Sequence, residues 1–220
     1  AKSSTTNSIY FRQGLGVQSD LKISPKWYGR IGYNYATLTN DTNYLDTRSA
    51  FYTRRPDKSP IAHNLLGRIS YTPNHIFNFQ VGLDRNFIGE GNRSLFLSDY
   101  GKPYPFAQIR ARFWHVEYLV MYQFLKEDYN NSWRSKYGAI HYLSWNIAKW
   151  LNAGIFETVV FQPKDTLLNR GYELEYLNPV IFYRPQEYAI GSSDNVLLGA
   201  SLSAKWKQHT FYGQLILDEF

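Results

Sequence analysis

The sequence predicts an all-β protein: an antiparallel transmembrane β-barrel, or part of a larger one, with about ten long strands and long loops. Apolar and polar residues alternate with a period of two over segments of about ten to twelve residues, the pattern of strands with one apolar and one polar face. Strands in soluble sheets are about five or six residues long, whereas crossing a bilayer at a tilt takes about nine to eleven. Short turns also alternate with long loops, as in outer-membrane barrels.

Aromatic residues provide a further observation, because they make up 18% of the 220 residues. Aromatic rings near strand ends suit the interface between a membrane and water. The residues that we expect at such ends are Trp27, Phe106, Trp114, Trp150, Trp206 and Phe211.

Composition limits the other classes of protein. The chain has no cysteine, which excludes a disulfide-stapled scaffold and a thiolate metal site. The net charge of +6 comes from Lys and Arg residues scattered singly through the strands, so nucleic acid is not an expected partner.

No apolar run is long enough for a spanning helix. No secretory leader begins at Ala1, so we expect the chain to start after processing or inside a longer protein. Residues 1–220 suit one barrel domain or a barrel fragment.

The first two predicted strands, residues 8–21 and 26–39, flank a turn that contains Pro25 and form a hairpin. The apolar face of the second strand comprises Trp27, Gly29, Ile31, Tyr33 and Tyr35.

A polar surface loop is predicted over residues 40–63, and a second hairpin follows it with strands 64–71 and 76–87. The second strand has the most regular alternation in the chain, with an apolar face of Phe77, Phe79, Val81 and Leu83. Residues 89–105 are predicted to form another loop, which contains a short apolar patch at residues 95–97.

Residues 106–125 alternate without a break, which is too long for one ordinary strand. A tight turn near Trp114 and His115 is therefore expected to divide them. The polar residues 126–138 are predicted to form a loop. The remaining strands form two pairs, residues 139–150 with 151–162 and residues 195–206 with 209–220.

Residues 171–195 interrupt this pattern with a long segment that is rich in aromatic, polar and proline residues. Long loops without a period are usually functional or disordered, and the apolar content argues against disorder. We expect an insertion folded into the lumen, acting either as a plug or as a polysaccharide-binding element. The candidate residues are Tyr176, Asn178, Tyr183, Arg184, Glu187, Asp194 and Asn195.

Four charged residues are predicted to line the lumen: Arg110, Arg112, Glu157 and Asp218. By strict alternation Glu157 falls on the side of its apolar neighbours, where a charge in lipid is costly. Three alternatives remain. A bulge turns Glu157 inward, or it is buried against the insertion and paired with Arg184 or Arg170, or it lies near the aqueous rim.

Catalytic and metal-binding patterns are weak. Asp218 and Glu219 are adjacent in a strand and face opposite ways, so they make a poor acid/base pair. Glu157 and Asp218 could form the carboxylate pair of a glycosidase, but we expect no such activity. Alternation places His141 and Ser144 on opposite faces, which argues against a nucleophile–base dyad. The five histidines lack metal-ligand spacing. We therefore predict a non-enzymatic protein without a cofactor or metal.

Five segments between about Gly89 and Phe220 have a recognisable order and wording: NRSLFLSDY, KYGAIHYLSWN, AGIFETVVF, YELEYLNPVIFYRPQEYAIGSSDNVLLG and FYGQLILDEF. Over this range the chain resembles the outer-membrane capsule-assembly proteins (Wzi-like), especially their gliding-motility branch (RemB-like). The resemblance implies an outer-membrane barrel of a Gram-negative bacterium that assembles or attaches surface polysaccharide, or takes part in gliding. It also implies that the family's barrels contain more strands than this chain.

The expected partners are membrane lipid or lipopolysaccharide, surface polysaccharide, and other outer-membrane or motility proteins. Two alternatives stay open. One is a porin-like or fatty-acid-type transport channel in the outer membrane, and the other is a soluble β-sheet domain that binds carbohydrate.

Overall fold

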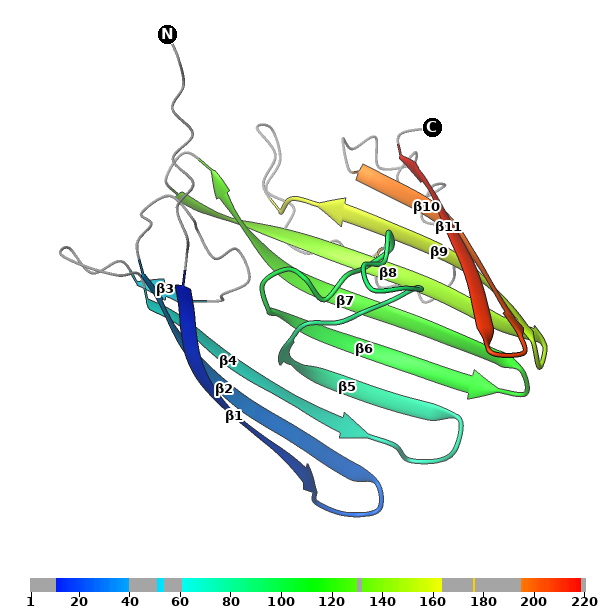
Figure 1. Cartoon of the computed structure of the whole chain (residues 1–220), viewed down its shortest axis with the longest axis horizontal. Coiled ribbons are helices and arrows are strands. Elements are labelled where there is room, and N and C mark those ends of the chain that lie inside the picture. Colours follow the sequence, from blue (N-terminus) through cyan, green and yellow to red (C-terminus); the bar gives the residue numbers. More distant parts are fainter. Residues whose placement is uncertain are drawn as a thin grey trace, which may run out of the picture.

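The computed structural model describes residues 11–39, 51–53, 61–129, 132–163, 176 and 195–218. Every long regular element within these residues is a β-strand (Figure 1). The strands are β1 (Phe11–Lys22), β2 (Trp27–Thr39), β3 (Phe51–Thr53), β4 (Ile61–Tyr71), β5 (Phe77–Asp84), β6 (Tyr104–Phe113), β7 (Val116–Tyr129), β8 (Ser132–Ala148), β9 (Leu151–Phe161), β10 (Asn195–Trp206) and β11 (His209–Asp218). No helix in the described part of the chain is long and apolar enough to cross a membrane.

Ten of the strands form one antiparallel sheet in which each strand pairs with its neighbours along the chain. The order is β1-β2-β4-β5-β6-β7-β8-β9-β10-β11, and the short β3 pairs with the start of β4 on the edge opposite β2. The all-β class, the antiparallel pairing and about ten long strands are thus as the alternation predicts. The sheet is not closed, because β1 and β11 lie at its two ends without pairing with each other.

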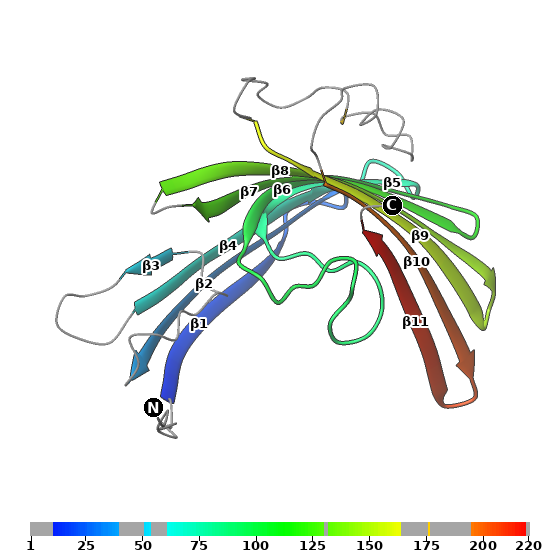
Figure 2. The ribbon, with the colours of Figure 1, turned by 90° about the horizontal axis from the view of Figure 1, so that it is seen from above.

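The sheet is strongly curved, and Figure 2 shows it as an arch with β1 and β11 at its two feet. The connection between β5 and β6, residues 85–103, lies on the concave side of the arch. Because the connections alternate between the two ends of the sheet, the β1–β2, β4–β5, β6–β7, β8–β9 and β10–β11 turns all lie at one end. We call this the turn end.

The register separates two faces of different chemistry. Opposed residues of antiparallel strands point to the same side, so each face can be followed across all ten strands. The convex face is mostly apolar, and many of its side chains are exposed, as Val17 is at 76%. His141 and Glu157 are polar residues of this face, and both are buried. The concave face carries most of the polar side chains.

Two predicted loops contain strand. The hairpin of β7 and β8 continues through most of residues 126–138, where Glu127 opposes Arg134 and Lys136 Nζ lies 2.9 Å from Glu127 Oε2. Within residues 40–63 the structure has β3 and the first residues of β4. Both loop predictions were wrong at these positions because they relied on long apolar alternation, whereas backbone pairing extends beyond the alternating residues.

The predicted division at Trp114 and His115 is confirmed. A two-residue turn joins Phe113 to Val116, and Trp114 has a positive φ of 52°. The β10–β11 turn has the same length, with Lys207 at a φ of 55°. Two-residue hairpins favour this left-handed conformation because its twist matches that of the strands.

Exposed aromatic residues gather at the turn end, on the convex face or in the turns themselves. They are Trp27, Phe77, Phe113, Trp114, Trp145, Trp150, Trp206 and Phe211. Phe106 departs from the prediction because it is buried on the concave face, where the guanidinium carbon of Arg68 lies 5.3 Å from its ring centroid. In β6 the neighbouring Ala107 belongs to the convex face with Val81, so alternation points Phe106 to the concave face.

Candidate functional site: the concave face

Arg68 is the centre of a polar network on the concave face of β4 and β5. Its Nε donates to Asp84 Oδ2 at 2.8 Å, and its other nitrogens donate to Gln80 Oε1 at 3.3 Å and to the Arg85 carbonyl at 3.0 Å. Both side chains of the Arg68–Asp84 pair are mostly buried. A charge-assisted network of this kind holds its members in one geometry.

A second cationic group lies on β6 and β7. Arg110 Nη1 is 3.1 Å from Glu117 Oε1, and Arg112 pairs with the other oxygen of the same carboxylate. Two guanidinium groups thus share one carboxylate. Arg110 and Arg112 lie on the concave face, the side that alternation predicts for lumen charges.

The inward-folded segment, residues 85–103, covers the middle of the concave face. The ring of Phe96 stacks on Phe156 of β9, with centroids 4.7 Å apart and planes 4° from parallel. Phe96 and Ile88 form a buried cluster with concave-face residues Leu119, Met121, Ile140 and Phe156. The concave face is therefore apolar where this segment lies on it.

Hydrogen bonds attach the same segment to β11. Gln214 Nε2 donates to Ser94 Oγ at 3.0 Å, and Gln214 Oε1 accepts from the Leu95 backbone N–H at 3.1 Å. Because these contacts join residues about 120 positions apart, the segment bridges the arch from β5 to its far edge.

Two glycines permit the close approach of this segment. Gly91 has a φ of 80°, and a Cβ at this position would lie 2.6 Å from the Tyr212 hydroxyl. A Cβ on Gly199 of β10 would lie 2.5 Å from the Phe96 ring. Sequence reasoning assigned the inward fold to residues 171–195 and missed this segment, although the apolar patch at 95–97 within a polar loop was an available signal.

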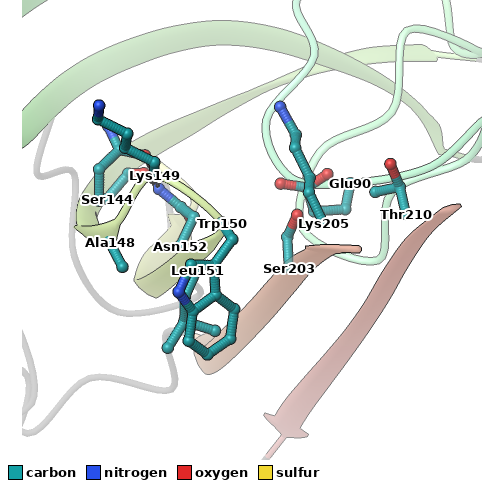
Figure 3. A pocket seen from close by; sticks show the side chains of 11 residues that line it. Glu90, Ser144, Ala148, Lys149, Trp150, Leu151, Asn152, Ser203, Lys205 and Thr210 are labelled. Atoms are coloured by element: carbon teal, nitrogen blue, oxygen red, sulfur yellow. Dashed lines mark hydrogen bonds between the residues drawn. The ribbon is translucent and has the colours of Figure 1, made fainter. Parts of the chain in front are cut away.

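A polar hollow of about 260 Å³ lies beside the inward-folded segment at the turn end of the concave face (Figure 3). Asn152 Nδ2 donates to Ser144 Oγ and to Asn146 Oδ1, both at 2.9 Å, and forms part of its wall. The remaining lining residues are Glu90, Ala148, Lys149, Trp150, Leu151, Ser203, Lys205 and Thr210. The sequence did not single out this hollow because its residues come from separate strands and no local motif joins them.

Glu157 lies on the convex face and is fully buried beside His141 of β8. His141 Nδ1 is 3.6 Å from Glu157 Oε2. The register of β9 is unbroken around Glu157, so neither the inward-turning bulge nor the aqueous rim describes its position. Glu157 therefore lies on the face opposite to Arg110 and Arg112, so the prediction that these residues line one lumen together is wrong. Its burial agrees with one of the three alternatives, and the neighbour that the structure describes is His141. Arg170 and Arg184 lie outside the described residues.

Of the insertion candidates, Tyr176 and Asn195 are described. Tyr176 is buried on the convex face, in a cluster with Ala139, Val159, Phe161 and Val196, and its ring centroid is 4.8 Å from that of Phe161. Asn195 is exposed at the start of β10. The other candidates lie outside the described residues: Asn178, Tyr183, Arg184, Glu187 and Asp194. The predicted position of the whole insertion in the lumen also rests on residues outside the described ranges.

Asp218 ends β11 on the concave face, so the register separates it from Glu157 on the opposite side of the sheet. His141 and Ser144 also point to opposite faces. Among the described residues no group of three His, Asp or Glu side chains is arranged to hold a metal ion.

Comparison of the chain with protein-family models, with curated proteins and with solved structures finds no match.

Proposed function

We propose that the sheet is part of the wall of a β-barrel in the outer membrane of a Gram-negative bacterium. In this arrangement the convex face contacts lipid and the concave face lines the lumen. The observation that carries the proposal is the sorting of exposed apolar residues. In the described strands, the exposed large hydrophobic residues lie on the convex face, apart from Tyr212 and from Ile147 at the β8–β9 bulge. Soluble monomers rarely expose apolar patches of more than a few hundred Å².

The dimensions of the apolar face support a bilayer environment. On β8, Tyr137 and Trp145 lie on the convex face eight positions apart (137 to 145). At about 3.3 Å per residue they are about 26 Å apart along the strand, which a tilt of about 40° reduces to about 20 Å in height. The apolar band of outer-membrane barrels is about 25 Å tall and is bordered by aromatic residues.

Membrane insertion also requires that the sheet is closed into a complete barrel. An unpaired strand edge in lipid leaves backbone N–H and C=O groups without hydrogen bonds, at a cost of several kcal/mol each. β1 and β11 are the two ends of the described sheet. The proposal therefore includes further strands beside them, so that this sheet is one part of a larger barrel.

Within that barrel, the role we propose is assembly or attachment of surface polysaccharide, or a part in gliding motility, without catalysis. The resemblance of residues 89–220 to capsule-assembly and gliding proteins supports this role. The inward-folded segment supports it as well, because it covers part of the concave face and so narrows any passage for solutes. The arginine clusters supply donors for sugar hydroxyls and carboxylates.

A transport channel is the second candidate, and the polar hollow that stays uncovered at the turn end is the observation that favours it. Conductance of planar bilayers that contain the purified protein separates the two roles. A steady open conductance would support transport, and a closed pore would support assembly or attachment.

Fractionation of the producing cells tests the location. We expect the protein in the outer-membrane fraction, released by detergent and not by salt or carbonate. Release into aqueous buffer would exclude the barrel and favour a soluble carbohydrate-binding sheet.

Retention of surface polysaccharide by cells that lack the protein tests the role. We expect reduced retention or reduced gliding, restored by the unaltered protein and less well by an Arg110→Ala, Arg112→Ala variant. If a deletion strain retains its polysaccharide and moves normally, the proposed role is wrong even when the protein is in the outer membrane.

A further inference from the structure

The polar hollow at the turn end has a cationic lining. Lys149 comes from the β8–β9 turn and Lys205 from β10, and in Figure 3 their side chains stand on opposite sides of the hollow. The one carboxylate of the lining is that of Glu90, which the inward-folded segment contributes. Two ammonium groups against one carboxylate leave the hollow with a net positive charge.

These lysines differ from four arginines of the concave face. Arg30, Arg68, Arg110 and Arg112 each lie within ion-pair distance of a carboxylate. No ion pair joins Lys149 or Lys205 to any residue in the part of the chain that the structure describes. Both ammonium groups are therefore available to an anion that enters the hollow.

The rest of the lining suits a ligand that carries hydroxyl groups and has one flat apolar side. The amide of Asn152 holds Ser144 and Asn146 in place, and the hydroxyls of Ser203 and Thr210 open into the same space. The exposed indole of Trp150 forms part of the wall. A volume of about 260 Å³ lies just below the usual range for small-molecule pockets, about 300–1,000 Å³, so the hollow suits a ligand that is smaller than most.

We propose that this hollow is a binding site for a small hydroxylated molecule that carries one carboxylate or phosphate group. Lys149 and Lys205 bind the anionic group from its two sides. The Asn152 network, together with Glu90, bonds the hydroxyls, and Trp150 contacts the apolar part of the ligand. The site stands on its own lining and does not depend on the polysaccharide role.

Calorimetric titration of the full chain, folded in detergent micelles at low ionic strength, tests the site. The probes are glucuronate, glucose 6-phosphate and neutral glucose, which share a ring and differ in charge. We expect at least one anionic probe to bind at least about tenfold more tightly than glucose, because charge-assisted hydrogen bonds are about twice as strong as neutral ones. The preference should weaken as salt is added. The comparison of the two anions identifies whether carboxylate or phosphate is preferred.

Variants show whether the binding belongs to the hollow. Lys149→Gln with Lys205→Gln should abolish the preference for the anion, whereas Lys207→Gln should leave it unchanged, since Lys207 lies against Trp206 outside the lining. Circular dichroism of each variant checks the sheet, and single Lys→Gln variants replace the double variant if it does not fold.

Equal affinity for glucose and both anions, or anion binding that survives the lysine changes, would overturn the site. Absence of binding at millimolar concentrations would do so too. These binding results are independent of where the protein resides in the cell and of polysaccharide retention. A failure of the binding site therefore leaves the proposed function standing, and a failure of the proposed function leaves the binding site standing.

Discussion

The concave face differs between its two regions, the flank at β1 and β2 and the centre at β7 to β9. At the flank, the concave side chains are polar and open to solvent, as in the exposed pair of Asp20 and Arg30. At the centre, concave residues such as Leu119 and Phe156 are apolar and buried beneath the inward-folded segment. The convex face is mostly apolar in both regions, apart from the buried His141 and Glu157 at the centre. The concave face is therefore apolar where another part of the chain covers it and polar where it is open to solvent.

The largest effect on stability is expected at the centre of the concave face, which the inward-folded segment covers. Phe156→Ala removes a buried ring that stacks on Phe96 and should destabilise the protein by about 3–5 kcal/mol. The matched change Phe79→Ala removes a partly exposed convex ring and should cost about 1 kcal/mol or less in detergent micelles. Urea denaturation followed by tryptophan fluorescence measures both. Equal losses would mean that the two rings share one kind of environment.

The next prediction separates the two faces at the uncovered flank. Val17→Arg and Gln18→Arg alter adjacent, exposed positions of β1 that point to opposite faces. In lipid vesicles, arginine at position 17 should lower folding stability by about 2–4 kcal/mol, whereas arginine at 18 should have little effect. Equilibrium refolding into vesicles measures the difference. If both variants fold as well as the parent chain, the convex face does not meet lipid.

A smaller effect is expected where the inward-folded segment meets β10. Gly199→Ala places a methyl group against the Phe96 ring, and relieving this overlap should cost about 1–3 kcal/mol. Gly213→Ala on β11 is the control, because nothing lies within 4 Å of the added carbon. Thermal unfolding of the two variants gives the comparison, and an unchanged midpoint for Gly199→Ala would show that Phe96 lies elsewhere.

The smallest predicted effect concerns the bridge to β11. Gln214→Ala removes the hydrogen bonds to Ser94 and Leu95 and should cost about 1 kcal/mol. The inward-folded segment should then become more sensitive to limited proteolysis, while Gln18→Ala on the uncovered flank should not change the digestion pattern. Identical digestion of both variants would argue against the bridge.

Several elements were predictable from local pattern. The strand of Phe77, Phe79 and Val81 and the turn at Trp114 follow from alternation and from strand length, which are properties of neighbouring residues. The burial of Glu157 was one of three alternatives that the sequence left open, since an isolated charge on an apolar face is costly. Its partner His141 was not predicted, since the β8–β9 register that joins them depends on the position of the turn.

The segment that folds inward could not be predicted from pattern alone. Residues 85–103 and 171–195 are both long and contain apolar residues, so composition did not distinguish them. The position of Phe96 is settled by the space beside Gly199 and by Gln214, which lie more than a hundred residues further along the chain.

The amino-acid sequence alone predicts most of the strands and the division of each into an apolar and a polar side, because side chains of an extended chain point alternately in opposite directions. The tertiary structure alone decided which side is concave, what covers it, and which separate residues meet in the hollow. Those properties arise from curvature and from contacts between distant strands, which no period in the sequence encodes.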